Sequence, residues 1–168
     1  MIVGIPKEIK DNEKRVALTP FGASQLTNNG HTVLIEDNAG LGSGYTNKKY
    51  TSFGAKIVNS PKEIFDKSDL IVKVKEPQKD EISLIKEGQM IFTFFHFAAS
   101  ESLTKGILDS KCISIAYETI EDEDGNLPIL VPMSEVAGRM SIQNGAKCLE
   151  GSMGGKGKLL GGVPGVKP

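Results

Sequence analysis

The chain has no tryptophan, only two cysteines and no long run of apolar residues. A helix needs about 20 consecutive apolar residues to cross a bilayer, so we expect no membrane partner. The first residues, MIVGIPKEIK, lack a basic stretch followed by an apolar one, which is unlike a secretory signal. These absences predict a cytoplasmic protein.

Motifs and charge clusters that would indicate other kinds of function are also missing. Cys112 and Cys148 lie far apart with no C-x-x-C spacing, which favours two reduced thiols over a disulfide or a metal site. The net charge is -1 and lysines are interspersed with glutamates, which argues against a nucleic-acid partner. No P-loop, HExxH or GxSxG motif occurs. We therefore expect no metal site and no nucleotide-phosphate site of the P-loop kind.

What is present is a regular alternation of short apolar runs with helix signals. The composition, 39% hydrophobic and 24% charged over 168 residues, is that of a globular domain. Near-continuous apolar strands separated by helices predict a parallel sheet covered on both faces. The fold class expected is α/β: a Rossmann-like (flavodoxin-like), doubly wound, mostly parallel sheet. The strands are expected at 2–5, 32–36, 55–58, 70–75, 90–94 and 113–117.

Capping residues give the helix starts. Thr19 is expected to cap a helix whose first residue is Pro20. Ser60 and Pro61 repeat this pattern, and Glu63 completes a predicted capping box. Shorter helices are expected at 81–85 and 100–108.

After Tyr117 the sequence changes character. We expect a longer helix with Ser134 as its cap, and one strand-like piece at 158–160. The chain finishes with Gly-Gly-Val-Pro-Gly-Val-Lys-Pro, a composition typical of a connector, so we expect another segment to follow.

Ligands of doubly wound sheets bind at the carboxyl ends of the strands. Lys73 and Lys75 close the expected strand 70–75, and residues two apart in a strand share a face. Lys75, last before Glu76 and Pro77, could hold a carboxylate or polarise a carbonyl oxygen there. Lys73, one position deeper on the same face, is expected to support the site. The alternative is that both lysines simply reach for water, as lysines at strand ends commonly do.

Two more strand-end residues are candidates. His96 follows the expected strand 90–94 and could act as a general acid or base, or could be a packed histidine. Arg15 follows the first strand and could grip a carboxylate, although a solvated loop arginine is the simpler interpretation. His31, the other histidine, is most simply a turn residue. The stretch GLGSGY is not interpreted as a dinucleotide motif, because its spacing is wrong and the helix after it is short.

Six blocks of the sequence together resemble a known family. They are VGIPKEIKDNEKRVALTP, AGLGSGY, LIVKVKEP, FTFFHFAAS, IAYETI and PMSEVAGR. In this order and spacing they resemble the amino-terminal part of bacterial alanine dehydrogenase, over essentially the whole chain. The related proton-translocating transhydrogenases share the GIP and RVA-TP patterns, but they are not expected to show the histidine of FFHFAAS or the KVKEP block.

The resemblance implies an activity and a set of site residues. The family oxidises L-alanine to pyruvate and ammonium with NAD, reversibly, and commonly forms hexamers. Arg15 then matches the residue that binds the substrate carboxylate, and Lys75 the one that contacts the carboxylate or carbonyl oxygen. His96 matches the acid/base, Met133 a residue of the substrate pocket, and Ser134 one that touches the cofactor.

The chain lacks what the family carries beyond this part. No glycine fingerprint, ribose-binding acidic residue or catalytic aspartate follows. We therefore expect residues 1–132 to form the substrate-binding domain. Residues 133–168 are expected to be a connecting helix and the start of the otherwise missing NAD-binding domain. The chain alone is expected to be inactive. The alternatives are a non-catalytic module that binds small carboxylates or serves assembly, and a transhydrogenase domain.

Overall fold

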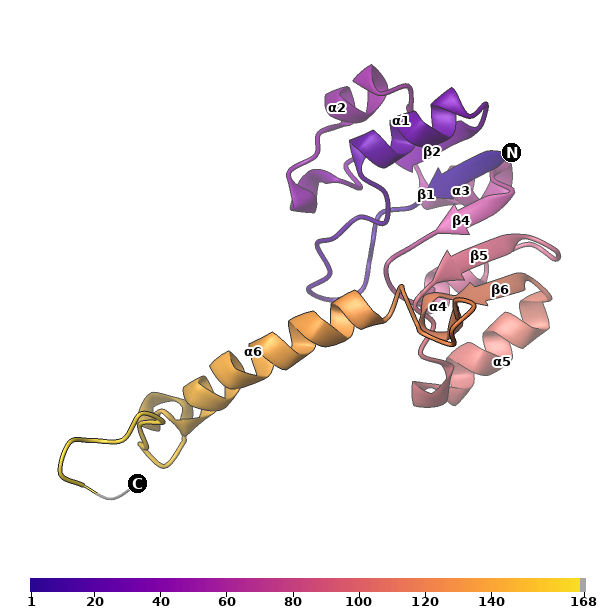
Figure 1. Cartoon of the computed structure of the whole chain (residues 1–168). Helices are drawn as coiled ribbons and strands as arrows, with labels where there is room; N and C mark the ends of the chain where they lie inside the picture. The colour runs from indigo at the N-terminus through magenta and orange to yellow at the C-terminus, as the bar shows by residue number, and fades with distance from the viewer. Residues whose placement is uncertain (167–168) are drawn as a thin grey trace. The chain divides into compact units, whose positions relative to one another are not determined.

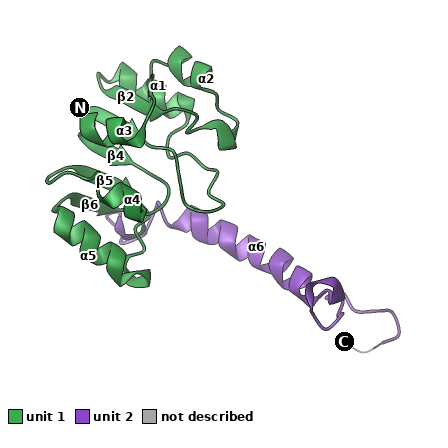
Figure 2. Cartoon of the chain, turned by 180° about the vertical axis from the view of Figure 1, so that it is seen from behind, with its two compact units in different colours: residues 1–118 green, residues 119–168 purple. Residues whose placement is uncertain are grey.

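The computed structural model describes residues 1–166. They divide into two compact units, and each is described by itself (Figure 2). The first unit runs from Met1 to Glu118 and the second begins at Thr119. The first unit contains the whole sheet (Figure 1).

A six-stranded sheet forms the centre of the first unit, and every strand pair in it is parallel. Its order is β3-β2-β1-β4-β5-β6, so the chain winds outward from β1 in both directions. This confirms the predicted α/β doubly wound class. Of its two common orders, this one is the Rossmann order rather than the flavodoxin order. The strands are β1 (Ile2–Ile5), β2 (Thr32–Glu36), β3 (Lys56–Val58), β4 (Leu70–Val72), β5 (Met90–Thr93) and β6 (Ile113–Ala116).

Helices follow the strands and begin at the capping residues. The Thr19 hydroxyl accepts a hydrogen bond from the Gly22 N–H at 3.1 Å. The Ser60 hydroxyl accepts one from the Glu63 N–H at 3.3 Å, but the Glu63 carboxylate bonds the N–H of Asn59 rather than that of Ser60. The helices are α1 (Pro20–Asn28), α2 (Asn47–Ser52), α3 (Pro61–Lys67), α4 (Lys79–Ile82) and α5 (Glu101–Ser110).

Two apolar clusters pack on opposite faces of the sheet. Successive strand residues point to opposite faces, and in β2 Val33 and Ile35 join one cluster while Leu34 joins the other. The first of these clusters receives side chains from α1 and α2, and the second from α3 and α5. Burial on both faces explains why the strands are almost entirely apolar.

The strand after α3 is shorter than predicted. It ends at Val72 rather than at Lys75. The Lys73 N–H still bonds the Phe92 carbonyl at 3.0 Å, and the backbone then bends at Val74 and Lys75. The prediction that Lys73 and Lys75 share one face of a strand is therefore wrong, because neither residue belongs to β4.

The second unit contains one long helix, α6 (Val131–Leu149), none of whose residues is buried. The predicted cap at Ser134 is wrong, because the helix begins earlier and the Ser134 N–H already bonds the Leu130 carbonyl at 3.1 Å. Pro132 explains the early start, since proline favours the first turn of a helix. The strand expected at 158–160 does not form.

The boundary expected between residues 132 and 133 falls inside α6, and the division of roles between two domains stays a prediction. Cys112 and Cys148 are free thiols. None of the helices that the structure describes has both the length and the hydropathy needed to span a bilayer.

Candidate functional site

Loops gather at the carboxyl ends of the central strands and line an open hollow of about 340 Å³. Two cationic residues, Arg15 and Lys73, contribute to its lining, together with the hydroxyl-bearing Ser43. Phe94 and Tyr117, which follow β5 and β6, add aromatic surface. A guanidinium beside apolar surface suits a small organic anion. The ammonium of Lys73 is buried in ion pairs and does not add to this. Arg15 also lines a neighbouring hollow of about 400 Å³, which includes Lys7 and Lys14.

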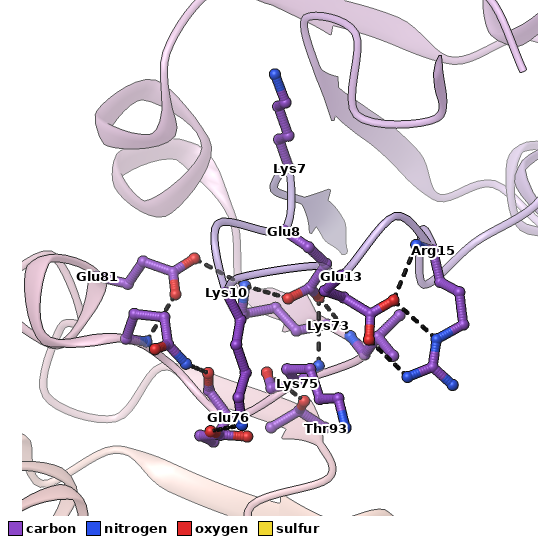
Figure 3. Close-up of polar contacts among 12 residues, drawn as sticks. Lys7, Glu8, Lys10, Glu13, Arg15, Lys73, Lys75, Glu76, Glu81 and Thr93 are labelled. Carbon is purple, nitrogen blue, oxygen red and sulfur yellow. Dashed lines mark hydrogen bonds and ion pairs between the residues drawn. The ribbon is translucent and has the colours of Figure 1, made fainter. Parts of the chain in front are cut away.

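Arg15 is held by a carboxylate two residues before it (Figure 3). Its Nε and one terminal nitrogen donate to the two Glu13 oxygens at 2.8 and 2.6 Å, a bidentate pair. The Arg15 hydrogen bond is the main reason that the pKa of Glu13 falls to about 2, against the opposing effect of burial. The same pair raises the pKa of Arg15. The guanidinium is therefore oriented as well as permanently charged.

Lys73 is not solvated, contrary to the interpretation that both lysines reach for water. Its side chain is 0% exposed. The ammonium lies 3.1 Å from a Glu8 oxygen and 2.8 Å from a Glu81 oxygen. Ion pairing with two carboxylates is what allows a lysine to be buried.

Lys75 is half-buried, and its backbone is fixed on both sides. A Glu8 oxygen accepts from the Val74 N–H at 2.6 Å and from the Lys75 N–H at 3.4 Å. The Thr93 hydroxyl donates to the Lys75 carbonyl at 2.8 Å. The charge of Lys75 contributes to the low pKa of Glu13, so its ammonium lies within electrostatic reach of the Arg15 pair.

His96 lies at the carboxyl end of β5, the strand that pairs with β4. It adopts the left-handed conformation, with φ 53°, which is uncommon for a residue other than glycine. The Glu118 carboxylate accepts from the backbone N–H of His96 at 2.7 Å and of Phe95 at 3.1 Å. The exposed imidazole stacks on Phe94, with ring centroids 6.0 Å apart, and Phe94 lines the hollow.

The structure brings the loops that carry Arg15, Lys75 and His96 to one edge of the sheet. Of the three, Arg15 lines the hollow. Met133 and Ser134 belong to α6 in the second unit, and their roles stay predictions.

Sequence reasoning missed the glutamates that organise this edge. Glu8, Glu13 and Glu118 each follow a strand end, and each fixes a residue that was singled out. Applying the strand-end rule to anions as well as cations would have found them. Glu81 could not be found this way, because its position at α4 gave no signal beyond a helix start.

The described residues do not offer a cradle for a dinucleotide. Such a cradle needs a glycine turn between the first strand and its helix. Residues 6–19, between β1 and α1, contain no glycine. GLGSGY forms a short 3-10 turn at Leu41–Ser43 ahead of the brief α2. Over residues 1–166, no three His, Cys, Asp or Glu side chains converge as a metal site.

Comparison with known proteins gives one family. The model of the family described as "Alanine dehydrogenase/PNT, N-terminal domain" matches residues 4–137. Alanine dehydrogenase of Methanococcus maripaludis is 56% identical over 168 residues, which are all of this chain and 45% of that protein. The Bacillus subtilis alanine dehydrogenase is 54% identical over 99% of this chain and 43% of its own length. The chain thus spans less than half the length of these curated relatives.

Comparison with solved structures gives the same family. An L-alanine dehydrogenase superposes with a TM-score of 0.87 at 47% identity, over all of this chain and 46% of the other. A transhydrogenase from Sinorhizobium meliloti gives a TM-score of 0.67 at 28% identity, over 71% of this chain and 36% of its own.

Proposed function

The chain belongs to the alanine dehydrogenase/PNT N-terminal domain family, and we propose that it is the substrate-binding part of an NAD-dependent alanine dehydrogenase. The observation that carries the proposal is the hollow at the strand ends, where an oriented arginine meets apolar surface. Its substrates are L-alanine and pyruvate, each a carboxylate with one methyl group.

Arg15, Lys75 and His96 have roles that agree with their surroundings. Arg15 holds the substrate carboxylate, since Glu13 presents its guanidinium in a fixed plane. Lys75 stabilises negative charge on the substrate carboxylate or carbonyl oxygen. His96, exposed at the same edge, gives and takes the protons of imine hydrolysis. Met133 would add to the pocket and Ser134 would touch the cofactor.

NAD would supply the hydride chemistry, and the described residues do not hold it. The chain alone is therefore proposed to be inactive. Mixing it with L-alanine and NAD should give no steady rise in NADH absorbance, and a steady rise would contradict this part of the proposal. Assembly as a homo-oligomer, a hexamer for the full-length protein, and a cytoplasmic location are further proposals that rest on the family.

A transhydrogenase domain is the second candidate, because a transhydrogenase shares the fold. The identities of 47% to an alanine dehydrogenase structure and 28% to the transhydrogenase favour the first candidate. Pyruvate binding distinguishes the two candidates, because pyruvate is a substrate of alanine dehydrogenase and not of a transhydrogenase.

Pyruvate should bind to the chain, and calorimetric titration measures this directly. Arg15→Ala should weaken binding at least about tenfold, because a charge-assisted bidentate contact is lost. The matched control is Arg139→Ala, the other arginine, which is highly exposed and lies 4.0 Å from Glu135. Equal affinity in all three proteins, or no binding by the unaltered chain, would contradict a carboxylate site at Arg15.

A further inference from the structure

Three charged side chains, those of Glu8, Lys73 and Glu81, form a buried cluster (Figure 3). Lys73 is 0% exposed, and the side chains of Glu8 and Glu81 are 2% and 3% exposed. One ammonium faces two carboxylates, so the cluster is not a simple neutral pair. Such clusters are weak evidence for stability, because apolar side chains of similar volume often serve as well. This raises the question of what the charges hold in place.

Glu8 connects the cluster to the backbone that carries Lys75. One of its oxygens pairs with Lys73 and the other accepts from the N–H groups of Val74 and Lys75. Thr93, at the end of β5, donates to the carbonyl of the same Lys75. The peptide groups on both sides of the Lys75 Cα atom are therefore held by side chains from other strand ends.

Glu81 connects the cluster to the segment that precedes α4. Glu81 accepts from Lys73 at 2.8 Å and, through its second oxygen, from the Gln78 N–H at 2.8 Å. The segment from Lys73 to α4 is thus tied at both ends, with Lys75 between them. The cluster leaves the strand end little freedom to move.

We propose that Glu8 is a positioning residue, which fixes the Lys75 backbone so that its ammonium meets the substrate oxygen. The inference rests on the proposed function and goes beyond it, because Glu8 acts through Lys75 and not on the substrate. Small displacements of a site group cost much of its effect, so a fixed backbone matters for a residue with a long, flexible side chain.

A double-mutant cycle on pyruvate affinity tests the proposal. Glu8→Gln should weaken binding about tenfold in the unaltered chain, because it removes the charge that Lys73 and the two amides share. In a Lys75→Ala background the same change should cost less than about twofold, because the group being positioned is gone. Equal losses in both backgrounds, or no loss in either, would overturn the proposal.

A second variant and a second measurement separate the possible failures. Thr93→Val keeps the side-chain shape and removes only the bond to the Lys75 carbonyl, and it should weaken binding about threefold. Amide hydrogen exchange at Val74 and Lys75 should quicken about tenfold in Glu8→Gln, while β2 amides stay unchanged.

The two measurements fail independently of each other. Absence of pyruvate binding by the unaltered chain would refute the proposed function but would leave the exchange test standing. Unchanged exchange at Val74 and Lys75 would refute the positioning role whether or not pyruvate binds.

Discussion

Replacing Lys73 with methionine is expected to lower the free energy of unfolding by about 3–5 kcal/mol. The change leaves the carboxylates of Glu8 and Glu81 buried without their cation, and an uncompensated buried charge is costly. Methionine has nearly the same length and fills the same space, so lost packing contributes little. Chemical denaturation at pH 7 measures the loss.

The loss should shrink as the pH falls. Burial is the main cause that raises the pKa of Glu81 above its ordinary value of 4.5, with Lys73 opposing it. A carboxyl group with a raised pKa binds its proton more tightly in the folded chain, so stability falls as pH rises through that pKa. Without Lys73 this effect grows, and the difference between the two proteins should be smaller near pH 4.5 than at pH 8.

The matched control is Lys62→Met. Lys62 forms an ion pair with Asp66 at 2.5 Å on the surface of α3, where its side chain is 73% exposed. Exposed pairs contribute little, so this change should leave stability nearly unaltered. If Lys73→Met lowers the free energy of unfolding as little as Lys62→Met does, the buried cluster does not contribute to stability.

Replacing His96 with glutamine is expected to lower kcat at least about 100-fold in the full-length enzyme to which we propose the chain belongs. Glutamine retains hydrogen-bonding groups but cannot exchange a proton near neutral pH. The backbone should remain in place, because Glu118 bonds the N–H groups of residues 95 and 96 and not the imidazole.

His31→Gln is the control for this change, since the chain has two histidines. His31 lies just before β2, at the amino end of the sheet, where its Nδ1 lies 3.4 Å from the Met1 amino group. Its replacement should leave kcat within about twofold. Near-normal kcat in His96→Gln would remove that residue from the mechanism.

Local signals in the sequence predicted most of the fold. The strands β1 and β2 have the expected bounds, because their apolar runs end in turn residues. The caps at Thr19 and Ser60 act within three residues of themselves, and they mark the starts of α1 and α3 correctly. The expected cap at Ser134 fails because Pro132, two residues earlier, also suits a helix start.

Long-range contacts explain what the sequence did not reveal about the site. Lys73 was expected to support the site from the same strand face as Lys75, but its burial could not be predicted, because its partner Glu8 lies 65 positions away in the chain. The hydrophobic periodicity of the sequence gives no information about such a long-range pairing. Arg15, Lys75 and His96 could be chosen as candidate site residues from the sequence. Ligands of doubly wound sheets bind at the carboxyl ends of the strands, and those ends can be located along the chain. What holds each of them in place depends on side chains that the fold brings near.

The most direct test of the account is to map where pyruvate binds. Titration of the ¹⁵N-labelled chain with pyruvate should shift the backbone amide signals of Arg15, Phe94 and Tyr117, around the hollow at the strand ends. The amides of Ser102 and Gly106, which line a hollow of about 530 Å³ between α4 and α5, should stay unchanged. Shifts at Ser102 and Gly106 without shifts around Arg15, or no shifts at all, would contradict a substrate site at the carboxyl ends of the strands.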